Sequence, residues 1–243
     1  MIRRTLATVV AAVGIAALLP LTASAADPVV PPRIKAMQSG KANAQVAGSC
    51  ALSVPNRIAI GRDVLVLKAK VSGPCAIAGS SSLWNLNHPS RGDVQSILFD
   101  SSDPDGNGTY AFLDEDPLGN QTWQGRGSFN ADGSQNTQNN VPITVKLAAG
   151  AWISSSRTAD VVTLKGTSLL YSVTTNSYFK RSAGGVFQFR EQGSTTWQTL
   201  KSVYTNSKGE VTMAYRYSKT RDYRFSLYST SISWDLGSAV TTR

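Results

Sequence analysis

The sequence is poor in the side chains from which catalytic and metal centres are most often built, with 1 histidine and 2 cysteines in 243 residues. A nucleophile triad would need His88 beside a serine and a carboxylate, and the sequence has no Gly-x-Ser-x-Gly elbow. His88 instead stands in the turn-like run Asn-His-Pro-Ser, where a histidine is normally solvated. Zinc has too few ligands of its usual kinds. These shortages favour a non-enzymatic protein.

Long apolar runs are missing after the N-terminal segment, which excludes a later membrane span. The start combines Arg3 and Arg4, an apolar stretch from Leu6 to Leu21 and the small-residue end Ala-Ser-Ala. This is the pattern of a secretory signal peptide over residues 1–25, which we expect to be cleaved after Ala25. The mature product is therefore expected to be secreted.

Cys50 and Cys75 are expected to form a disulfide, because an even pair of cysteines in an exported chain is more often bridged than metal-binding or nucleophilic. A bridge closing a loop of about 26 residues would stabilise the fold by roughly 3 to 4 kcal/mol in the chain-entropy account. The predicted role of the pair is structural.

Charge is unevenly distributed along the chain. Residues 27–148 contain 10 basic and 10 acidic residues, whereas residues 149–243 contain 12 basic and 5 acidic residues. A basic exported segment is attracted to anionic cell-wall polymers or phospholipid headgroups, and Lys180, Arg181 and Lys219 are candidates for such attraction. A surface protein is the alternative partner for this basic segment. Export and the lack of a reading motif argue against nucleic acid.

Short alternating runs between clusters of Gly, Pro, Asn and Ser predict an all-β protein, because helical periodicity is hard to find. We expect an extended lead-in over residues 26–33, an N-terminal β-sandwich over 34–148 and a C-terminal basic β-sandwich over 149–243. The predicted strands of the first sandwich are Val64 to Val71, Leu83 to Leu86, Val94 to Phe99, Thr109 to Leu113, Thr122 to Phe129 and Ile143 to Leu147. The polar run from Asp132 to Asn140 predicts an exposed, mobile loop.

The C-terminal half contains about seven predicted strands, a number that suits an immunoglobulin-like sandwich. They are Val161 to Leu164, Thr167 to Val173, Val186 to Arg190, Thr196 to Val203, Glu210 to Tyr217, Tyr223 to Tyr228 and Ala239 to Thr242. Phe187, Phe189 and Trp197 are the predicted core residues. The remaining aromatics could line a sugar site, but alternating aromatics in β-proteins usually pack; they are Tyr215, Tyr217, Tyr223, Tyr228 and Trp234.

The C-terminal half also carries a family resemblance. The runs VFQFREQGSTTWQTLKSVYTNSKGEV (186–211) and RDYRFSLYST (221–230), with the closing SAVTTR, resemble immunoglobulin-like β-sandwich repeats of secreted actinobacterial proteins. The stretch GNGTYAFLDEDPLGNQTWQGRGSF (106–129) resembles the domain that precedes such modules. The resemblance implies two tandem immunoglobulin-like β-sandwich domains and an extracellular location. Such modules act as spacers, adhesion units or ligand-binding units, so the resemblance implies no particular activity.

The acidic stretch DSSDPDGNGTYAFLDED (100–116) fits the spacing of a calcium loop. Asp103, Asp105, Asn107 and Asp114 occupy loop positions 1, 3, 5 and 12, and Asp100 adds a carboxylate. A strand from Thr109 to Leu113 would, however, carry Asp114 up to about 17 Å from the turn, at roughly 3.3 Å per residue. The strand prediction and the full calcium loop exclude one another, and a hairpin tip between two strands is the favoured interpretation.

The sequence therefore predicts an exported non-enzymatic binding or structural module that associates with anionic cell-surface polymers. A calcium-binding exported protein that uses residues 100–114 is the alternative. An exported hydrolase is third, because acids such as Asp93 and Glu115 could approach each other in the fold, although nothing in the sequence marks them as a pair.

Overall fold

The computed structural model describes residues 46–103 and 105–243. The predicted signal peptide (1–25) and extended lead-in (26–33) lie outside these ranges. Within them, no helix is both long enough and apolar enough to cross a membrane. The described residues belong to one compact unit.

The all-β prediction is confirmed, since the described residues form β-strands and one short 3₁₀ turn, η1 (Pro74–Ala76). The strands before residue 148 are β1 (Val46–Ser53), β2 (Arg57–Ile60), β3 (Val64–Ser72), β4 (Ser81–His88), β5 (Gly92–Phe99), β6 (Asn107–Leu113), β7 (Gly119–Phe129), β8 (Gln135–Gln138) and β9 (Val141–Leu147). Those after it are β10 (Ala149–Thr158), β11 (Val161–Ser172), β12 (Ser177–Lys180), β13 (Gly184–Glu191), β14 (Gln198–Tyr204), β15 (Glu210–Arg216), β16 (Arg221–Leu227), β17 (Leu236–Gly237) and β18 (Thr241–Thr242).

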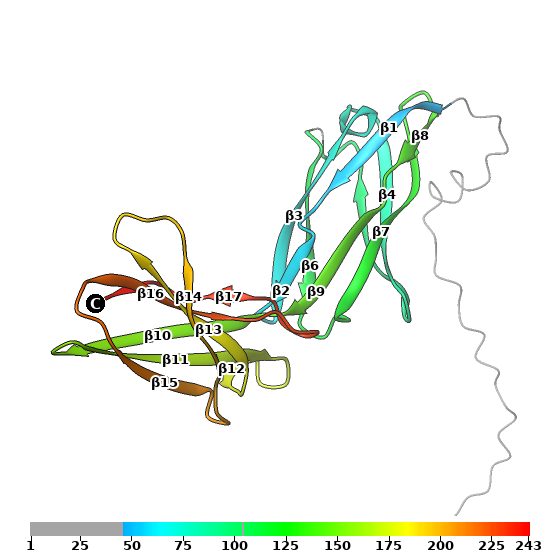
Figure 1. Ribbon diagram of the computed structural model, residues 1–243. Helices are drawn as coiled ribbons and strands as arrows, with labels where there is room; N and C mark the ends of the chain where they lie inside the picture. The colour runs from blue at the N-terminus through cyan, green and yellow to red at the C-terminus, as the bar shows by residue number, and fades with distance from the viewer. Residues whose placement is uncertain (1–45, 104) are drawn as a thin grey trace, which may run out of the picture. The chain divides into compact units, whose positions relative to one another are not determined.

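The strands up to β9 pair in the order of an immunoglobulin-like sandwich (Figure 1). One layer contains β3 between β1 and β6, and the other runs β5-β4-β7-β9-β2. β1 belongs to both layers, because its first half pairs in parallel with β8 and its second half pairs antiparallel with β3. This change of sheet joins the layers into one hydrogen-bonded system.

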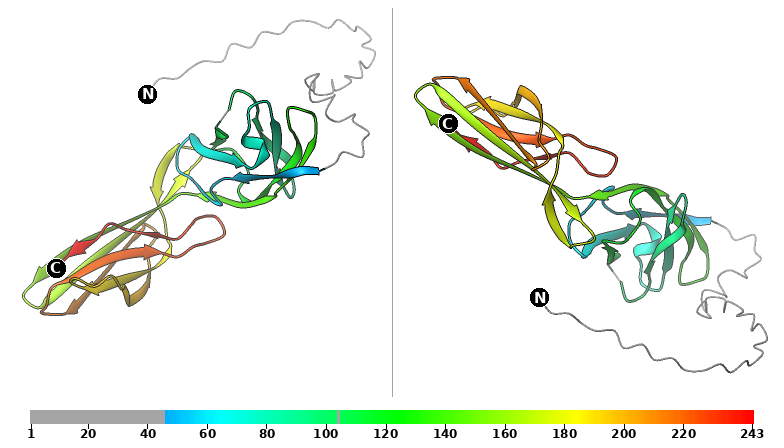
Figure 2. Two further views of the ribbon diagram at one scale, coloured as in Figure 1. Left: turned by 90° about the horizontal axis from the view of Figure 1, so that it is seen from above. Right: turned by 90° about the horizontal axis from the view of Figure 1, so that it is seen from below.

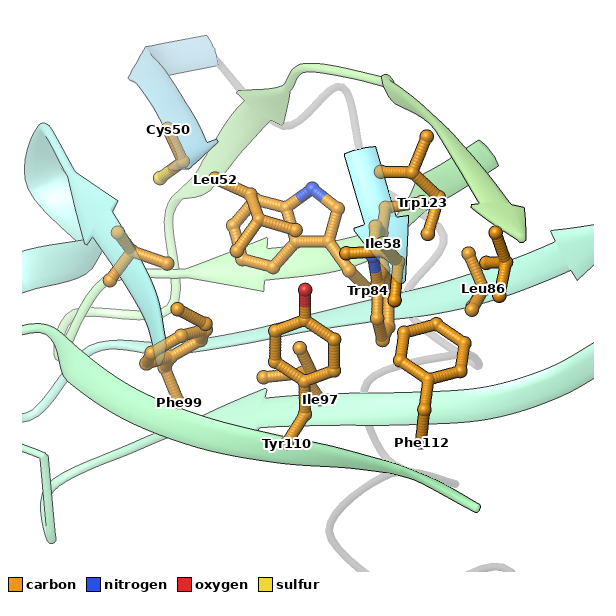
Figure 3. Packing of buried hydrophobic residues seen from close by; sticks show 14 of the residues in the cluster. Cys50, Leu52, Ile58, Trp84, Leu86, Ile97, Phe99, Tyr110, Phe112 and Trp123 are labelled. Carbon is orange, nitrogen blue, oxygen red and sulfur yellow. The ribbon is translucent and has the colours of Figure 1, made fainter. Parts of the chain in front are cut away.

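Aromatic side chains fill the space between these layers (Figure 3). Trp84 on β4 and Trp123 on β7 are both fully buried. Tyr110, on β6 of the opposite layer, meets Trp123 edge-to-face with ring centroids 5.4 Å apart. Such a pair contributes about 0.5–1.5 kcal/mol beyond its buried area. A buried tryptophan on the strand called C is a recurring core feature of immunoglobulin-like sandwiches, and Trp84 on β4 is such a buried tryptophan.

Cys50 and Cys75 form the predicted disulfide, with their Cα atoms 5.6 Å apart. The bridge connects β1 to η1, which directly follows β3, and both cysteines are buried. The Ser128 hydroxyl lies 2.8 Å from the Cys75 sulfur and 3.2 Å from the Cys50 sulfur. The bridge therefore fixes the strand that changes sheets.

The strands from β10 onward build a second two-layer arrangement (Figure 2). In one layer β11 pairs with β10, β12 and β15, and in the other the order is β14-β13-β16, followed by β17 and β18. Phe187 and Phe225 meet in the core with ring centroids 5.2 Å apart. Gly166 on β11 makes room for this pair, because a Cβ there would lie 2.9 Å from the Phe225 ring.

Several predicted boundaries were wrong. The two strands expected between Val161 and Val173 are one continuous strand, β11, and the loop expected from Asp132 to Asn140 contains β8 with Asn136 buried. Asn136 satisfies its polar side chain by donating to Asn130 at 2.8 Å and to Ser128 at 3.4 Å. Side-chain hydrogen bonds replace apolar contacts in β8. Its sequence therefore lacks the alternation of apolar and polar residues from which a strand is predicted.

The predicted boundary between residues 148 and 149 falls between β9 and β10. Hydrogen bonds nevertheless cross it, since the Leu147 amide donates to the Ile232 carbonyl at 2.8 Å and the Trp234 indole donates to the Ile58 carbonyl at 2.8 Å. Division of the chain into two independent domains stays a prediction.

Candidate binding face

The acidic segment after β5 connects two layers of the first sandwich. β5 pairs with β4 and β6 pairs with β3, so the expected hairpin tip between β5 and β6 was wrong. The carboxylates fold back on their own loop: Asp100 accepts a hydrogen bond from the Ser102 amide at 2.8 Å, and Asp105 accepts one from the Asn107 amide at 3.1 Å. Hydrogen bonds from Asn107 lower the pKa of Asp105. The Asp103 carbonyl accepts from Gly106 at 2.9 Å.

Asp114 lies at the other end of β6 from this loop. Asn107–Leu113 is a continuous strand, so Asp114 is displaced from Asn107 by about 23 Å at roughly 3.3 Å per residue. Its amide donates to the Asp63 carbonyl at 3.0 Å, and its carboxylate accepts from the Tyr171 hydroxyl at 3.2 Å. Over the ranges 46–103 and 105–243, no three His, Cys, Asp or Glu side chains gather to hold a metal. Calcium binding by the acidic loop stays a prediction, and Asp114 is too far from the loop to be one of its ligands.

His88 and Asp93 have local structural partners. One nitrogen of the His88 ring lies 3.2 Å from the Leu118 carbonyl, and the other accepts from the Ser90 amide at 3.2 Å. The Asp93 carboxylate accepts from Arg126 at 2.8 and 2.9 Å. A hydrogen bond from Asn85, together with that arginine, holds the pKa of Asp93 below its usual range.

The outer surface of the sheet formed by β14, β13 and β16 carries a cluster of polar side chains. Alternation on β13 places Phe187 in the core and Gln188 on the opposite side, next to Arg224 of β16. Trp197 immediately precedes β14, which pairs with β13 on its other side. We call Gln188, Arg190, Trp197, Arg224 and Ser226 the Trp197 face.

Trp197 lies against two arginines, so its predicted place in the core was wrong. The Arg190 and Arg224 guanidinium carbons are 4.8 and 4.4 Å from the indole centroid. A register shift between Phe187 and Gln188 accompanies this arrangement at the start of β14. The exposed part of the half-buried ring remains available to a ligand.

Hydrogen bonds fix the arginines of the Trp197 face. Gln188 accepts from the Arg224 Nε at 2.8 Å and from the Ser226 hydroxyl at 3.2 Å. Arg190 donates through Nε to Asp222 at 3.0 Å. Burial, together with the charge of Arg190, lowers the pKa of Arg224. Arginine stays charged in proteins, so the face carries two positive groups beside one aromatic ring.

A shallow hollow adjoins Arg224 on the same side of the sheet. The Tyr228 hydroxyl lies 3.0 Å from that of Ser202 across β14 and β16, and 47% of Tyr228 is exposed. The hollow is lined by Val186, Gln188, Arg224, Ser226, Leu227, Tyr228, Asp235, Leu236 and Gly237. It offers hydroxyl and amide groups beside apolar surface, which is the mixture found in small-ligand sites.

The acids of the C-terminal half are all engaged by cations. Asp160, Glu191, Glu210, Asp222 and Asp235 each belong to a salt bridge. In the described part of the chain, none of these salt bridges includes Arg224. Lys180 of the predicted cationic set is paired with Glu210 at 2.8 Å. Positive charge therefore remains available on the Trp197 face.

The other aromatics mostly pack, as the favoured interpretation expected. Tyr223 is buried, and its hydroxyl lies 2.6 Å from that of the partly buried Tyr215. The Arg221 guanidinium lies 3.5 Å from the Tyr217 ring centroid. The sequence prediction missed Gln188, Arg190 and Arg224, which occupy the outward positions between the core aromatics of β13 and β16. Period-two alternation was the signal that could have found them.

The immunoglobulin-like fold defines a structural class rather than a particular protein. No protein-family profile matches the sequence, and no curated protein matches it. Among solved structures, the chain is similar to the D0-D1 domain of intimin, with 14% identity, a TM-score of 0.26, and coverage of 79% of this chain and 96% of that chain. It is also similar to a Salmonella alpha-2-macroglobulin mutant, with 11% identity, a TM-score of 0.38, and coverage of 83% of this chain and 15% of that chain.

Proposed function

We propose that this chain is an exported, non-enzymatic binding module that attaches to anionic polymers of a cell surface through its basic C-terminal half. The observation that carries the proposal is the cationic Trp197 face, in which Arg224 is held in place by Gln188 while no acid in the described residues neutralises it in a salt bridge. The buried disulfide supports an oxidising compartment. A fixed guanidinium is suited to phosphate or carboxylate.

The positive charge of the C-terminal half would attract a polyanion before any specific contact forms. Residues 149–243 have 12 basic and 5 acidic side chains, so they attract a polyanion over roughly one Debye length, about 10 Å at 0.1 M salt. Salt should therefore weaken attachment. A sandwich with a fixed outer face can present such a surface without moving parts.

The test is retention of the mature chain on purified anionic cell-wall polymer at about 50 and about 500 mM salt. We expect retention at low salt and release at high salt. The variant Arg181→Gln/Lys208→Gln/Lys219→Gln should elute earlier than the parent protein. The matched control is Arg62→Gln/Lys68→Gln/Lys70→Gln, which removes three exposed charges from the first sandwich. Equal effects of the two variants, or no binding at low salt, would overturn the proposal.

A further inference from the structure

The Trp197 face combines two kinds of group that a simple polyanion site does not need together. Part of the Trp197 indole is exposed, and the Arg224 guanidinium lies 4.4 Å from its centroid. Attraction to a chain of phosphates would need positive charge alone. An aromatic ring beside a fixed cation suits a ligand that has an apolar face next to an acid group.

Groups that can bind hydroxyls lie on the same side of the sheet. Gln188, Ser226 and Tyr228 line the hollow next to Arg224. Asp235 lines it as well, and its carboxylate is paired with Arg57 at 2.6 Å. Gly237 lines it too, and a Cβ at that position would come within 3.3 Å of the Ser226 hydroxyl. A side chain at this position would therefore press on the Ser226 hydroxyl, which donates to Gln188 at 3.2 Å. Amides and hydroxyls both donate and accept hydrogen bonds, as a polyhydroxylated ligand requires.

We propose that the Trp197 face binds an acidic sugar unit of a polysaccharide, with the sugar ring against Trp197 and its acid group on Arg224. The hydroxyls of the adjoining sugar unit meet Gln188, Ser226 and Tyr228 in the hollow. This inference rests on the proposed attachment to anionic polymers and assigns it a chemical class. A carboxylate or a phosphate on the sugar offers Arg224 the same paired oxygens.

The experiment compares three polymers with the mature chain in calorimetric titrations at about 100 mM salt. Polygalacturonate has acidic sugars, polyphosphate has charge without sugars, and dextran has sugars without charge. We expect the tightest binding to polygalacturonate. A phosphorylated mannan in a further titration separates a sugar phosphate from a sugar carboxylate.

Variants then locate the site. Trp197→Ala and Arg224→Gln should each weaken polygalacturonate binding about tenfold or more. Arg224→Lys should also weaken it, because lysine keeps the charge but lacks the planar guanidinium that binds two oxygens at once. Trp197→Phe should retain more binding than Trp197→Ala. The matched control Lys68→Gln removes one exposed charge from β3 of the first sandwich, outside the basic C-terminal half. It should change binding less than twofold.

Unfolding midpoints separate a site from a purely structural stack. A variant that binds weakly while it unfolds at the parent midpoint supports the site. If Trp197→Ala has a lower unfolding midpoint than the parent, the binding of Trp197→Phe and Arg224→Lys is compared with the parent instead. Equal binding of polyphosphate and polygalacturonate, with no effect of the Trp197 variants, would overturn the acidic-sugar site and leave charge-driven attachment standing. Binding of no polyanion would overturn both proposals.

Discussion

At the scale of single residues, Glu210 shows how a surface carboxylate links three strands. It accepts a hydrogen bond from Lys180 of β12 at 2.8 Å and forms a salt bridge with Lys165 of β11 at 3.0 Å. Those two lysines lower the pKa of Glu210 from 4.5 to about 2. The carboxylate must be charged to hold both partners.

This pKa predicts the direction of an acid effect. A depressed pKa means that the stabilisation is fully present above pH 4.5 and is lost as the pH falls towards about 2. Glu210→Gln should therefore reduce the dependence of the unfolding free energy on pH in that window. Chemical denaturation at several pH values between these limits measures it.

Asp160→Asn is the control for Glu210→Gln, since Asp160 has a single salt bridge of 3.9 Å to Arg216. An unchanged pH dependence in Glu210→Gln would contradict the role assigned to the two lysines.

Gly166 tests the packing of the second core at one residue. An added Cβ would lie 2.9 Å from the Phe225 ring, closer than real Cβ contacts, so Gly166→Ala requires the ring or the strand to move. We expect a loss of about 1–3 kcal/mol in unfolding free energy, the usual cost of overpacking a core. Urea denaturation measures it, with the exposed Ser154→Ala on neighbouring β10 as control. Equal stability of Gly166→Ala and the parent would show that Phe225 has room to shift.

Residue-level prediction succeeded for Phe187, because a strand alternates and its apolar residues turn inward. It failed for Trp197, because an aromatic residue outside the regular strand follows no alternation. The stack with Arg190 and Arg224 depends on two strands far apart in the sequence. Long-range pairing of this kind has no local signature.

At the scale of elements, the disulfide is the main covalent constraint on β1. It connects β1 to η1 across 25 residues, and both cysteines are buried. Replacing both with serine should lower the unfolding free energy by about 3 kcal/mol, with burial of two hydroxyls adding to the loss. Denaturation of the parent with and without reductant, beside the Cys50→Ser/Cys75→Ser variant, measures the effect. Coincident curves would show that strand pairing alone holds β1.

Elements with clear alternation were predictable, as β3, β5 and β6 show. β1 was missed because its small residues and serines resemble a loop, although its two halves pair with β8 and with β3. The acidic segment between β5 and β6 was predicted as a hairpin, since turn residues give the position of a reversal but not the layer that the next strand joins.

At the scale of the whole molecule, the sequence predicted the all-β class from its short alternating runs and the disulfide from its two cysteines. It also located the excess positive charge in the C-terminal half. It did not predict which cations would remain outside salt bridges, because folding brings their partners from distant parts of the sequence, Gln188 to Arg224 and Glu210 to Lys180. The Trp197 face is therefore a property of the fold as much as of the sequence.

The disulfide has a mechanical consequence if the protein is attached to a surface as proposed. Tension applied to the N-terminal side of β1 would peel the strand from β8 only as far as Cys50, where the covalent bridge passes the load to Cys75. The segment between the cysteines, which are 25 positions apart in the sequence, would be shielded from the pull, withholding about 85 Å of chain at roughly 3.4 Å per residue. Single-molecule stretching should show a contour length longer by that amount after reduction. An equal length in both redox states would show that the bridge is not under load.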